Sequence, residues 1–278
     1  MWRDRGSVMG SVDVTTAVLA SGLRVPYAVT GNSAGQPVVF VHAYVESWRY
    51  FEVVLGRLPA TLHGYAPTQR GHGDADQPVH GYLPDDFAAD VAAFMDALGI
   101  WRAALVGTSS GGLVSQLVAS TYPDRVSALV LISSPAHLGD KPAVAEMWEN
   151  ICALDDPLDR EFVAEFVRST SPHSVPEDFV DTLIEESLKV PAQVWKETLR
   201  GLIDMDIRAN LKRITAPTLL IAGDDDAFVS DDQQVLLRAI PDARLSLYNG
   251  VGHGVHLAQP ERVVNDIVDF LTGSASSR

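Results

Sequence analysis

A strand that turns sharply at a serine and continues as a helix constrains the fold of this chain more than any other feature. Residues 105–113 read Leu-Val-Gly-Thr-Ser-Ser-Gly-Gly-Leu, so an apolar strand runs into Gly-x-Ser-x-Gly and then into a helical run. Gly107 and Gly111 are small enough to let the strand and the helix approach each other closely. The pattern is typical of a nucleophile elbow, which presents a serine hydroxyl above the sheet.

Two adjacent serines compete for the nucleophile position in this turn. A frame centred on Ser110 would place Thr108 where the first small residue belongs, so we predict Ser109 as the nucleophile. The amide of Ser110 then begins the helix with its N–H free to hold an oxyanion. A serine-rich and glycine-rich turn can also carry no chemistry, and the rest of the chain decides between these interpretations.

Composition narrows the class of protein. With 278 residues, 46% of them hydrophobic, the chain suits one domain with an insertion better than two full domains. A net charge of −15 argues against a nucleic-acid partner, which requires lysine and arginine to neutralise phosphates. Cys152 is the single cysteine and cannot form an internal disulfide, and the cysteines and histidines show no metal-ligand spacing. We therefore expect neither a metal nor a cofactor.

The amino-terminal segment and the hydropathy of the chain bear on its location. Residues 1–7 are charged and lead to a strand-like segment rather than to the apolar core of a signal peptide. No run approaches the 18 or more apolar residues of a membrane span. We therefore predict a cytoplasmic protein without a membrane partner.

Alternation of apolar strands with amphipathic helices predicts the fold class. After an expected hairpin at residues 11–15 and 23–29, strands and helices alternate along the chain. The pattern predicts an α/β fold with a mostly parallel sheet and helices on both faces. The expected strands are residues 37–41, 61–66, 101–106, 126–132, 217–222 and 244–248, and the expected helices are residues 47–58, 84–98, 110–121, 231–239 and 260–271.

The strand signal disappears between residues 135 and 212, where amphipathic runs take its place at residues 161–168, 177–190 and 192–203. We interpret residues 135–212 as a helical lid inserted into a core domain that comprises residues 1–134 and 213–278. Trp148 and Trp195 are our candidates for the substrate pocket, although such aromatic residues can also serve only to seal the lid onto the core.

An acidic residue and a histidine follow two later strands of the expected sheet. Asp226 is preferred over Asp224, because the latter directly follows the strand and is expected to bond to the turn. His253 is preferred over His256, which begins the approach to the last helix. The acids after residue 223 do not form a calcium loop, because Val229 and Val235 occupy the positions that need glycine and glutamate.

These residues occur in the chain order Ser, Asp, His and follow successive strands, which is the order expected of an α/β-hydrolase. A serine hydroxyl needs a base to take its proton, and the base needs a buried carboxylate to hold its tautomer. Ser109, His253 and Asp226 are the candidates for these roles. Tyr44, at the end of an earlier strand, is the candidate for a second oxyanion N–H. His72, between two glycines of a tight turn, is assigned a structural role.

The chain resembles the lidded α/β-hydrolases of the esterase, lactonase and cofactor-free haloperoxidase group over almost its whole length. One departure is Ala43, which stands where the family usually has glycine. The resemblance implies a triad of Ser109, Asp226 and His253, with the amides of Tyr44 and Ser110 as the oxyanion hole. The matching motifs are the strand-end turn at residues 41–44, the Arg-Gly-x-Gly loop at 69–73, the elbow at 107–111, Gly-Asp-x-Asp at 223–226 and the histidine turn at 252–253.

The nucleophile selects the reaction within this group. Dehalogenases and epoxide hydrolases of similar architecture use a carboxylate at the elbow, so Ser109 excludes them. Carbon-carbon hydrolases commonly follow the catalytic histidine with tryptophan, whereas this chain has Gly254. The leading hypothesis is hydrolysis of a small to medium, mostly apolar carboxylic ester or lactone through an acyl-enzyme. The alternatives are an enzyme in which peroxide, in place of water, attacks the same acyl-enzyme, and a ligand sensor that has the hydrolase fold.

Overall fold

The computed structural model describes residues 10–273, and the charged amino-terminal segment and the polar tail of the sequence lie outside these residues. One eight-stranded sheet, ordered β1-β2-β4-β3-β5-β6-β7-β8, organises the molecule. The pairs β1·β2 and β2·β4 are antiparallel and the remaining pairs are parallel. This sheet confirms the predicted α/β fold. The strands are β1 (Asp13–Val18), β2 (Arg24–Gly31), β3 (Gln36–Val41), β4 (Leu62–Pro67), β5 (Ala103–Thr108), β6 (Val126–Ile132), β7 (Thr218–Gly223) and β8 (Ala243–Tyr248).

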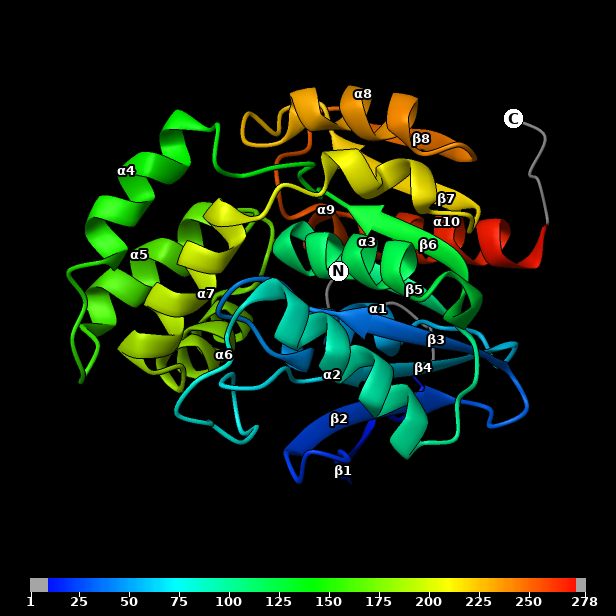
Figure 1. The fold of residues 1–278 in the computed structure, drawn as a ribbon, viewed down its shortest axis with the longest axis horizontal. Helices are drawn as coiled ribbons and strands as arrows, with labels where there is room; N and C mark the ends of the chain where they lie inside the picture. The colour runs from blue at the N-terminus through cyan, green and yellow to red at the C-terminus, as the bar shows by residue number, and fades with distance from the viewer. Residues whose placement is uncertain (1–9, 274–278) are drawn as a thin grey trace.

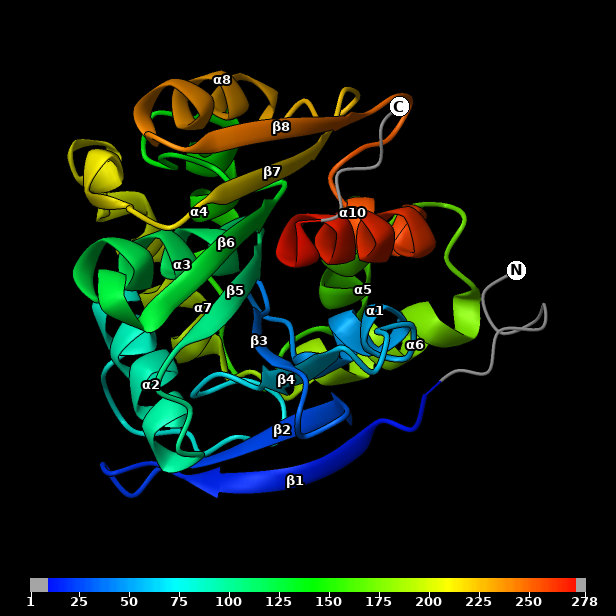
Figure 2. The ribbon, with the colours of Figure 1, turned by 90° about the vertical axis from the view of Figure 1, so that its right-hand side faces the viewer.

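Helices cover both faces of the sheet, as Figure 2 shows with the sheet seen near its edge. On one face lie α2 (Pro84–Ala97), α3 (Ser109–Thr121) and α8 (Ser230–Ala239). On the other face lie α1 (Glu52–Leu55), which follows the 3-10 turn η1 (Trp48–Phe51), and α10 (Pro260–Thr272). The expected single helix over residues 47–58 is thus a short 3-10 turn and one turn of α-helix. Short connections complete the core at η2 (Pro123–Arg125) and α9 (Val255–Ala258).

The central strands are apolar throughout because both of their faces are covered. Val39 and Leu105 point into the core beneath α2 and α3, while Phe40 and Val106, their immediate neighbours, point into the core beneath α1 and α10. Successive side chains of a strand alternate between faces, so a strand in the middle of such a sheet needs an unbroken apolar run. The sheet is therefore fixed from both sides at the strand ends that carry the candidate residues.

Four helices lie between β6 and β7 and gather beyond the carboxyl ends of the parallel strands (Figure 1). They are α4 (Pro142–Ile151), α5 (Arg160–Thr170), α6 (Glu177–Leu188) and α7 (Ala192–Asp204), and η3 (Arg208–Arg213) leads back to the sheet. Three of them correspond to the amphipathic runs named above, and α4 lies in the same predicted helical segment, outside those three runs. The ends of β3, β5, β7 and β8 thus face the α4–α7 helices across a common space.

Candidate active site

The turn between β5 and α3 holds Ser109 in a left-handed backbone conformation with a φ of 46°. Such a conformation costs about 1–3 kcal/mol for a residue with a side chain, and surrounding packing must maintain it. The packing is provided by the flanking glycines. A Cβ on Gly107 would lie 2.5 Å from the carbonyl oxygen of Gly111, and a Cβ on Gly111 would lie 2.3 Å from that of Val41. Neither position has room for a side chain, so the sequence pattern is required for this turn to close.

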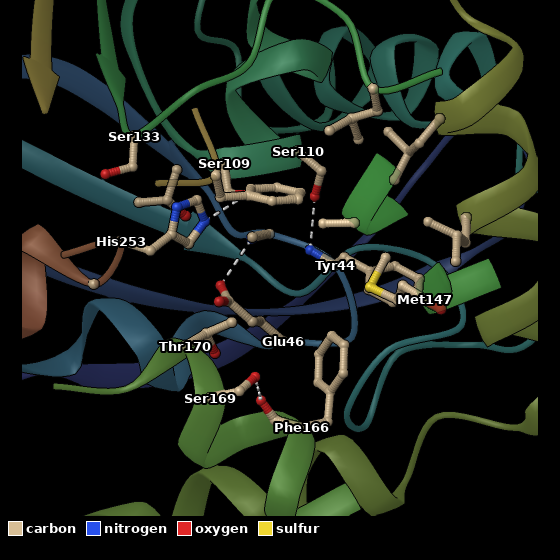
Figure 3. A pocket seen from close by; sticks show the side chains of 18 of the residues that line it. Tyr44, Glu46, Ser109, Ser110, Ser133, Met147, Phe166, Ser169, Thr170 and His253 are labelled. Carbon is tan, nitrogen blue, oxygen red and sulfur yellow. Dashed lines mark hydrogen bonds between the residues drawn. The ribbon is translucent and has the colours of Figure 1, made fainter. Parts of the chain in front are cut away.

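Three predicted side chains form a hydrogen-bonded row beside the turn. Nε2 of His253 lies 3.0 Å from Oγ of Ser109, and Nδ1 of His253 lies 2.9 Å from Oδ2 of Asp226. Figure 3 shows the Ser109 and His253 side chains directed toward each other. The three residues come from the loops after β5, β7 and β8, which end at the same edge of the sheet. An imidazole in this position can take a proton from the hydroxyl while a carboxylate holds its other nitrogen.

Asp226 is only 2% exposed, yet its neighbours favour the charged form of its carboxyl group. Its Oδ1 accepts the backbone N–H of Phe228 at 3.1 Å, while Oδ2 faces His253. Burial raises the pKa of Asp226, but the hydrogen bond and charge of His253, with the amides of Phe228 and Val229, outweigh burial and lower it. Asp226 is therefore ionised at neutral pH, as a group that must stabilise an imidazolium has to be.

Neither of the two competing residues takes part in this row of hydrogen bonds. Asp224 is exposed, and its Oδ1 accepts the backbone N–H of Gly250 at 2.6 Å, so it ties together the turns after β7 and β8. His256 is buried with its ring against Phe51, and neither of its ring nitrogens has a hydrogen-bond partner among the described residues. Burial, together with the nearby His253, lowers the pKa of His256 to about 3, so its ring is neutral.

The expected oxyanion donors lie together, but one of them is already bonded. The N–H of Tyr44 donates to Oγ of Ser110 at 2.8 Å, a contact that Figure 3 shows as a dashed line. The Tyr44 hydroxyl donates to the carbonyl oxygen of Trp195 at 2.7 Å, which fixes the loop after β3 against α7. Positive φ in this loop falls on Val45, at 57°, and not on Ala43. A side chain at the position where the family has glycine is therefore compatible with the loop.

Glu46 is a residue of this site that the sequence did not point to. Its Oε2 accepts the N–H of Ala43 at 2.8 Å, so its carboxyl group closes the turn that carries Tyr44. Burial raises the pKa of Glu46 to about 8, although the hydrogen bond from Ala43 opposes the shift. A glutamate five residues after the end of a strand resembles many solvent-exposed turns, and only its place in the cavity wall distinguishes it.

A cavity of about 650 Å³ opens beside Ser109 and His253. Apolar side chains make up much of its wall, and a few polar groups lie near the reacting hydroxyl. This composition is typical of small-molecule sites. Residues from the α4–α7 helices in the wall include Met147, Ile151, Phe162, Phe166, Leu199 and Leu202.

Neither tryptophan predicted for the pocket lines this cavity. Trp195 is completely buried and packs edge-to-face on Tyr44 and Phe166, with ring centroids 5.4 and 5.0 Å apart. Trp148 lies partly buried on α4 beneath the guanidinium of Arg200. The pocket prediction for these two residues thus differs from the structure, because both rings face the seams between helices, where the largest apolar area is buried.

The Gln69–Gly73 loop packs against His42, the residue after β3, and does not line the cavity. The N–H of Gln69 donates to Nε2 of His42 at 2.9 Å, and the Arg70 guanidinium forms a bidentate pair with Asp90 of α2. His72 shares a hydrogen bond of 2.8 Å with the carbonyl oxygen of Arg70 and is not part of the cavity wall. The structure therefore places His72 in a structural role outside the cavity wall, as predicted.

Within residues 10–273, no group of three or more histidine, cysteine, aspartate or glutamate side chains is arranged to hold a metal ion. No helix in that same range is both long and apolar enough to cross a bilayer.

Comparison with known proteins gives one consistent family. The alpha/beta hydrolase fold family matches residues 36–260, which is most of the chain. A non-heme chloroperoxidase of Streptomyces lividans is 28% identical over 92% of this chain and 99% of its own length. A 2-succinyl-6-hydroxy-2,4-cyclohexadiene-1-carboxylate synthase of Bacillus subtilis, itself named as putative, is 28% identical over 95% of this chain and 99% of its own. The crystal structure of the esterase RhEst1 from Rhodococcus sp. ECU1013 superposes with a TM-score of 0.81 at 27% identity and covers 93% of this chain and 98% of that one.

Proposed function

We propose that this chain, which belongs to the alpha/beta hydrolase family, cleaves a carboxylic ester or lactone through an acyl-enzyme on Ser109. The observation that carries the proposal is the row of hydrogen bonds from Ser109 through His253 to Asp226 at the wall of an apolar cavity. A serine at the elbow, rather than a carboxylate, fits acyl transfer. The esterase among the structural relatives agrees with this reaction class.

The reaction divides into acylation and deacylation. In acylation, Nε2 of His253 takes the proton of Ser109 as Oγ attacks the substrate carbonyl carbon, and Asp226 stabilises the imidazolium. The imidazolium then donates that proton to the leaving alcohol oxygen as the ester bond breaks. In deacylation, His253 takes a proton from water, the hydroxide attacks the acyl-enzyme, and the proton returns to Oγ of Ser109 as the acid leaves. The enzyme is regenerated with one water consumed.

The oxyanion of each tetrahedral intermediate is assigned to the amides of Tyr44 and Ser110. The Tyr44 N–H now donates to the Ser110 hydroxyl, so the substrate oxygen exchanges places with that hydroxyl as acceptor. The exchange replaces one neutral hydrogen bond by a bond to a developing negative charge, which is the stronger of the two. The resting contact keeps the Tyr44 amide aimed at the correct place before substrate arrives.

Residues 135–212 are proposed to act as a lid that shapes the acyl site without taking part in bond breaking. The cavity wall takes Met147 from α4, Phe162 and Phe166 from α5, and Leu199 from α7. These side chains favour a mostly apolar acyl group of small to medium size. A cytoplasmic location also stays a prediction from the sequence.

A second candidate activity is peroxide-dependent acyl transfer, in which peroxide replaces water in deacylation. The similarity to the chloroperoxidase of Streptomyces lividans is the observation that favours it. The two activities share the acyl-enzyme and differ only in the second nucleophile.

The test is steady-state turnover of p-nitrophenyl esters of graded acyl length, run beside lactones and a peroxide-dependent halogenation assay. The proposal expects multiple turnovers in the wild type and a loss of roughly four to six orders of magnitude in Ser109→Ala. A single burst of product without a steady state favours a ligand sensor and contradicts the proposal. Full activity in Ser109→Ala contradicts the assigned nucleophile.

A further inference from the structure

Among the described residues, the cavity wall contains several acidic side chains and no lysine or arginine. Three glutamates line the cavity, namely Glu46 from the loop after β3, Glu146 from α4 and Glu165 from α5. Figure 3 shows Glu46 between the Ser109–His253 pair and the Phe166 and Ser169 side chains of α5. Carboxylates therefore approach the acyl site both from the strand edge and from the α4–α7 helices.

Cations of the neighbouring helices are paired with other acids. On α5, Arg160 pairs with Glu185 and Arg168 pairs with Glu177. Before α4, the ammonium of Lys141 lies 2.5 Å from Asp232. No ion pair in the described part of the chain involves the three cavity glutamates, and the one hydrogen bond to a Glu46 oxygen comes from a neutral amide. The raised pKa of Glu46 keeps its carboxyl group mostly neutral at neutral pH, so the negative charge available to a molecule in the cavity is that of Glu146 and Glu165.

Elementary electrostatics decides which charge a ligand of this cavity carries. A carboxylate in the acyl part of a substrate would meet the carboxylates of Glu146 and Glu165 with no lysine or arginine among the described residues of the wall to compensate, and like charges repel. An ammonium group would meet carboxylates together with the rings of Tyr44, Phe162 and Phe166, which also line the cavity. Aromatic faces and carboxylates are the two kinds of group that hold organic cations.

We propose that the site selects esters whose acyl part carries a positively charged ammonium group and disfavours esters whose acyl part carries a carboxylate. This inference rests on the proposed ester hydrolysis, because it places the charge in the acyl site. Glu146 and Glu165 provide the charge recognition, and the apolar wall between them and Ser109 holds the chain that joins the ammonium group to the carbonyl.

Three p-nitrophenyl esters of similar length test the proposal, namely the esters of 4-(trimethylammonio)butanoic acid, of 5,5-dimethylhexanoic acid, and the monoester of glutaric acid. Each kcat/KM is divided by the second-order rate constant for reaction of the same ester with imidazole, so that differences in carbonyl reactivity cancel and attack by the glutarate carboxylate on its own ester does not enter the ratio. We expect the cationic ester to exceed its neutral isostere by about tenfold, which corresponds to two partly exposed charge interactions. The anionic ester should fall below the neutral one, and added salt should reduce both differences.

A charge-matched pair of variants separates the cavity acids from the net charge. In Glu146→Gln/Glu165→Gln the cationic preference should fall to near unity. The control Glu149→Gln/Glu161→Gln removes the same charge from the same two helices at exposed positions that do not line the cavity, and it should keep the preference. An unchanged preference in the first variant, equal loss in both, or a wild-type preference for the anionic ester overturns the proposal while leaving ester hydrolysis intact.

A binding measurement tests charge selection even if no ester is turned over. The absence of turnover would contradict only the proposed ester hydrolysis. Hexyltrimethylammonium should bind the wild type and the control variant in titration calorimetry, and it should bind Glu146→Gln/Glu165→Gln about tenfold more weakly. Equal affinity for all three proteins, or no binding by the wild type, contradicts charge selection.

Discussion

The carboxylate of Asp226 allows a prediction that the structure fixes atom by atom. Its Oδ1 accepts the N–H of Phe228, so in Asp226→Asn the amide oxygen is held there and the NH₂ group faces Nδ1 of His253. Nδ1 must then accept and Nε2 must carry the proton. A protonated Nε2 faces the Ser109 hydroxyl 3.0 Å away and cannot take its proton.

The magnitude follows from these contacts. With the wrong tautomer, kcat should fall about 10⁴-fold, which is roughly 5.5 kcal/mol of barrier. Turning the amide around to restore the tautomer would place NH₂ against the Phe228 N–H and cost about 1–3 kcal/mol for an unmet buried donor. The turned amide is therefore unfavourable, so the variant should keep the wrong histidine tautomer and its low kcat.

Asp224→Asn is the matched control in the same turn. Its Oδ1 accepts one backbone N–H from Gly250 in an exposed position, and an asparagine oxygen can accept the same bond. Steady-state kinetics with a p-nitrophenyl ester should show less than about a threefold change, and thermal melts should be similar for the two variants. Greater damage from Asp224→Asn, or more than about a tenth of activity left in Asp226→Asn, refutes the reasoning.

Acid stability gives an independent readout of the same carboxylate. The pKa of Asp226 is lowered in the folded protein, so its ionised form contributes stability that is present above the unfolded value, near 4, and is lost as pH falls through the folded pKa. Asparagine cannot titrate. Denaturant titrations should therefore show the difference in unfolding free energy between wild type and Asp226→Asn shrinking below about pH 4, and a difference that stays constant down to pH 2 contradicts this.

Two further predictions concern packing. In Gly111→Ala the new Cβ lies 2.3 Å from a backbone carbonyl oxygen at the end of β3. Urea titration should therefore show a loss of about 3 kcal/mol or more in the free energy of unfolding. An unfolding free energy equal to that of the wild type would show that the turn can relax. Trp195→Ala should lose about 3–5 kcal/mol and Trp148→Ala less, with neither changing the ratio of kcat/KM between long and short acyl esters. Phe166→Ala should change that ratio, because Phe166 lines the cavity. A changed ratio in either tryptophan variant would show that its ring contacts the substrate after all.

Local patterns account for the parts of the molecule that the sequence predicted well. The elbow was evident because Gly107 and Gly111 have no room for any other residue, so the sequence has to show small residues there. The parallel strands were evident because burial on both faces demands an unbroken apolar run. Asp226 and His253 followed from their positions at strand ends, since the carboxyl ends of parallel strands converge at one edge.

Features that depend on packing between distant segments could not be read from the sequence. The bond between the Tyr44 amide and Ser110 joins residues 66 positions apart, and the place of Glu46 in the cavity depends on residues of α4 and α5 that are about 100 positions away in the chain and complete the same wall. Trp195 has the same amphipathic spacing whether its ring faces the cavity or the seam of α7. Hydrophobic period gives the buried side of a helix, but it does not distinguish a filled core from a wall around a ligand.

Covalent labelling measures the central assignment most directly. Wild-type protein treated with diethyl p-nitrophenyl phosphate should gain one diethylphosphoryl group, and peptide mass spectrometry should place it on Ser109. His253→Ala should slow the labelling strongly, because the base that activates the hydroxyl is removed. A label on Ser110 or Ser133, or a wild type that takes no label while it still turns over esters, would contradict Ser109 as the nucleophile.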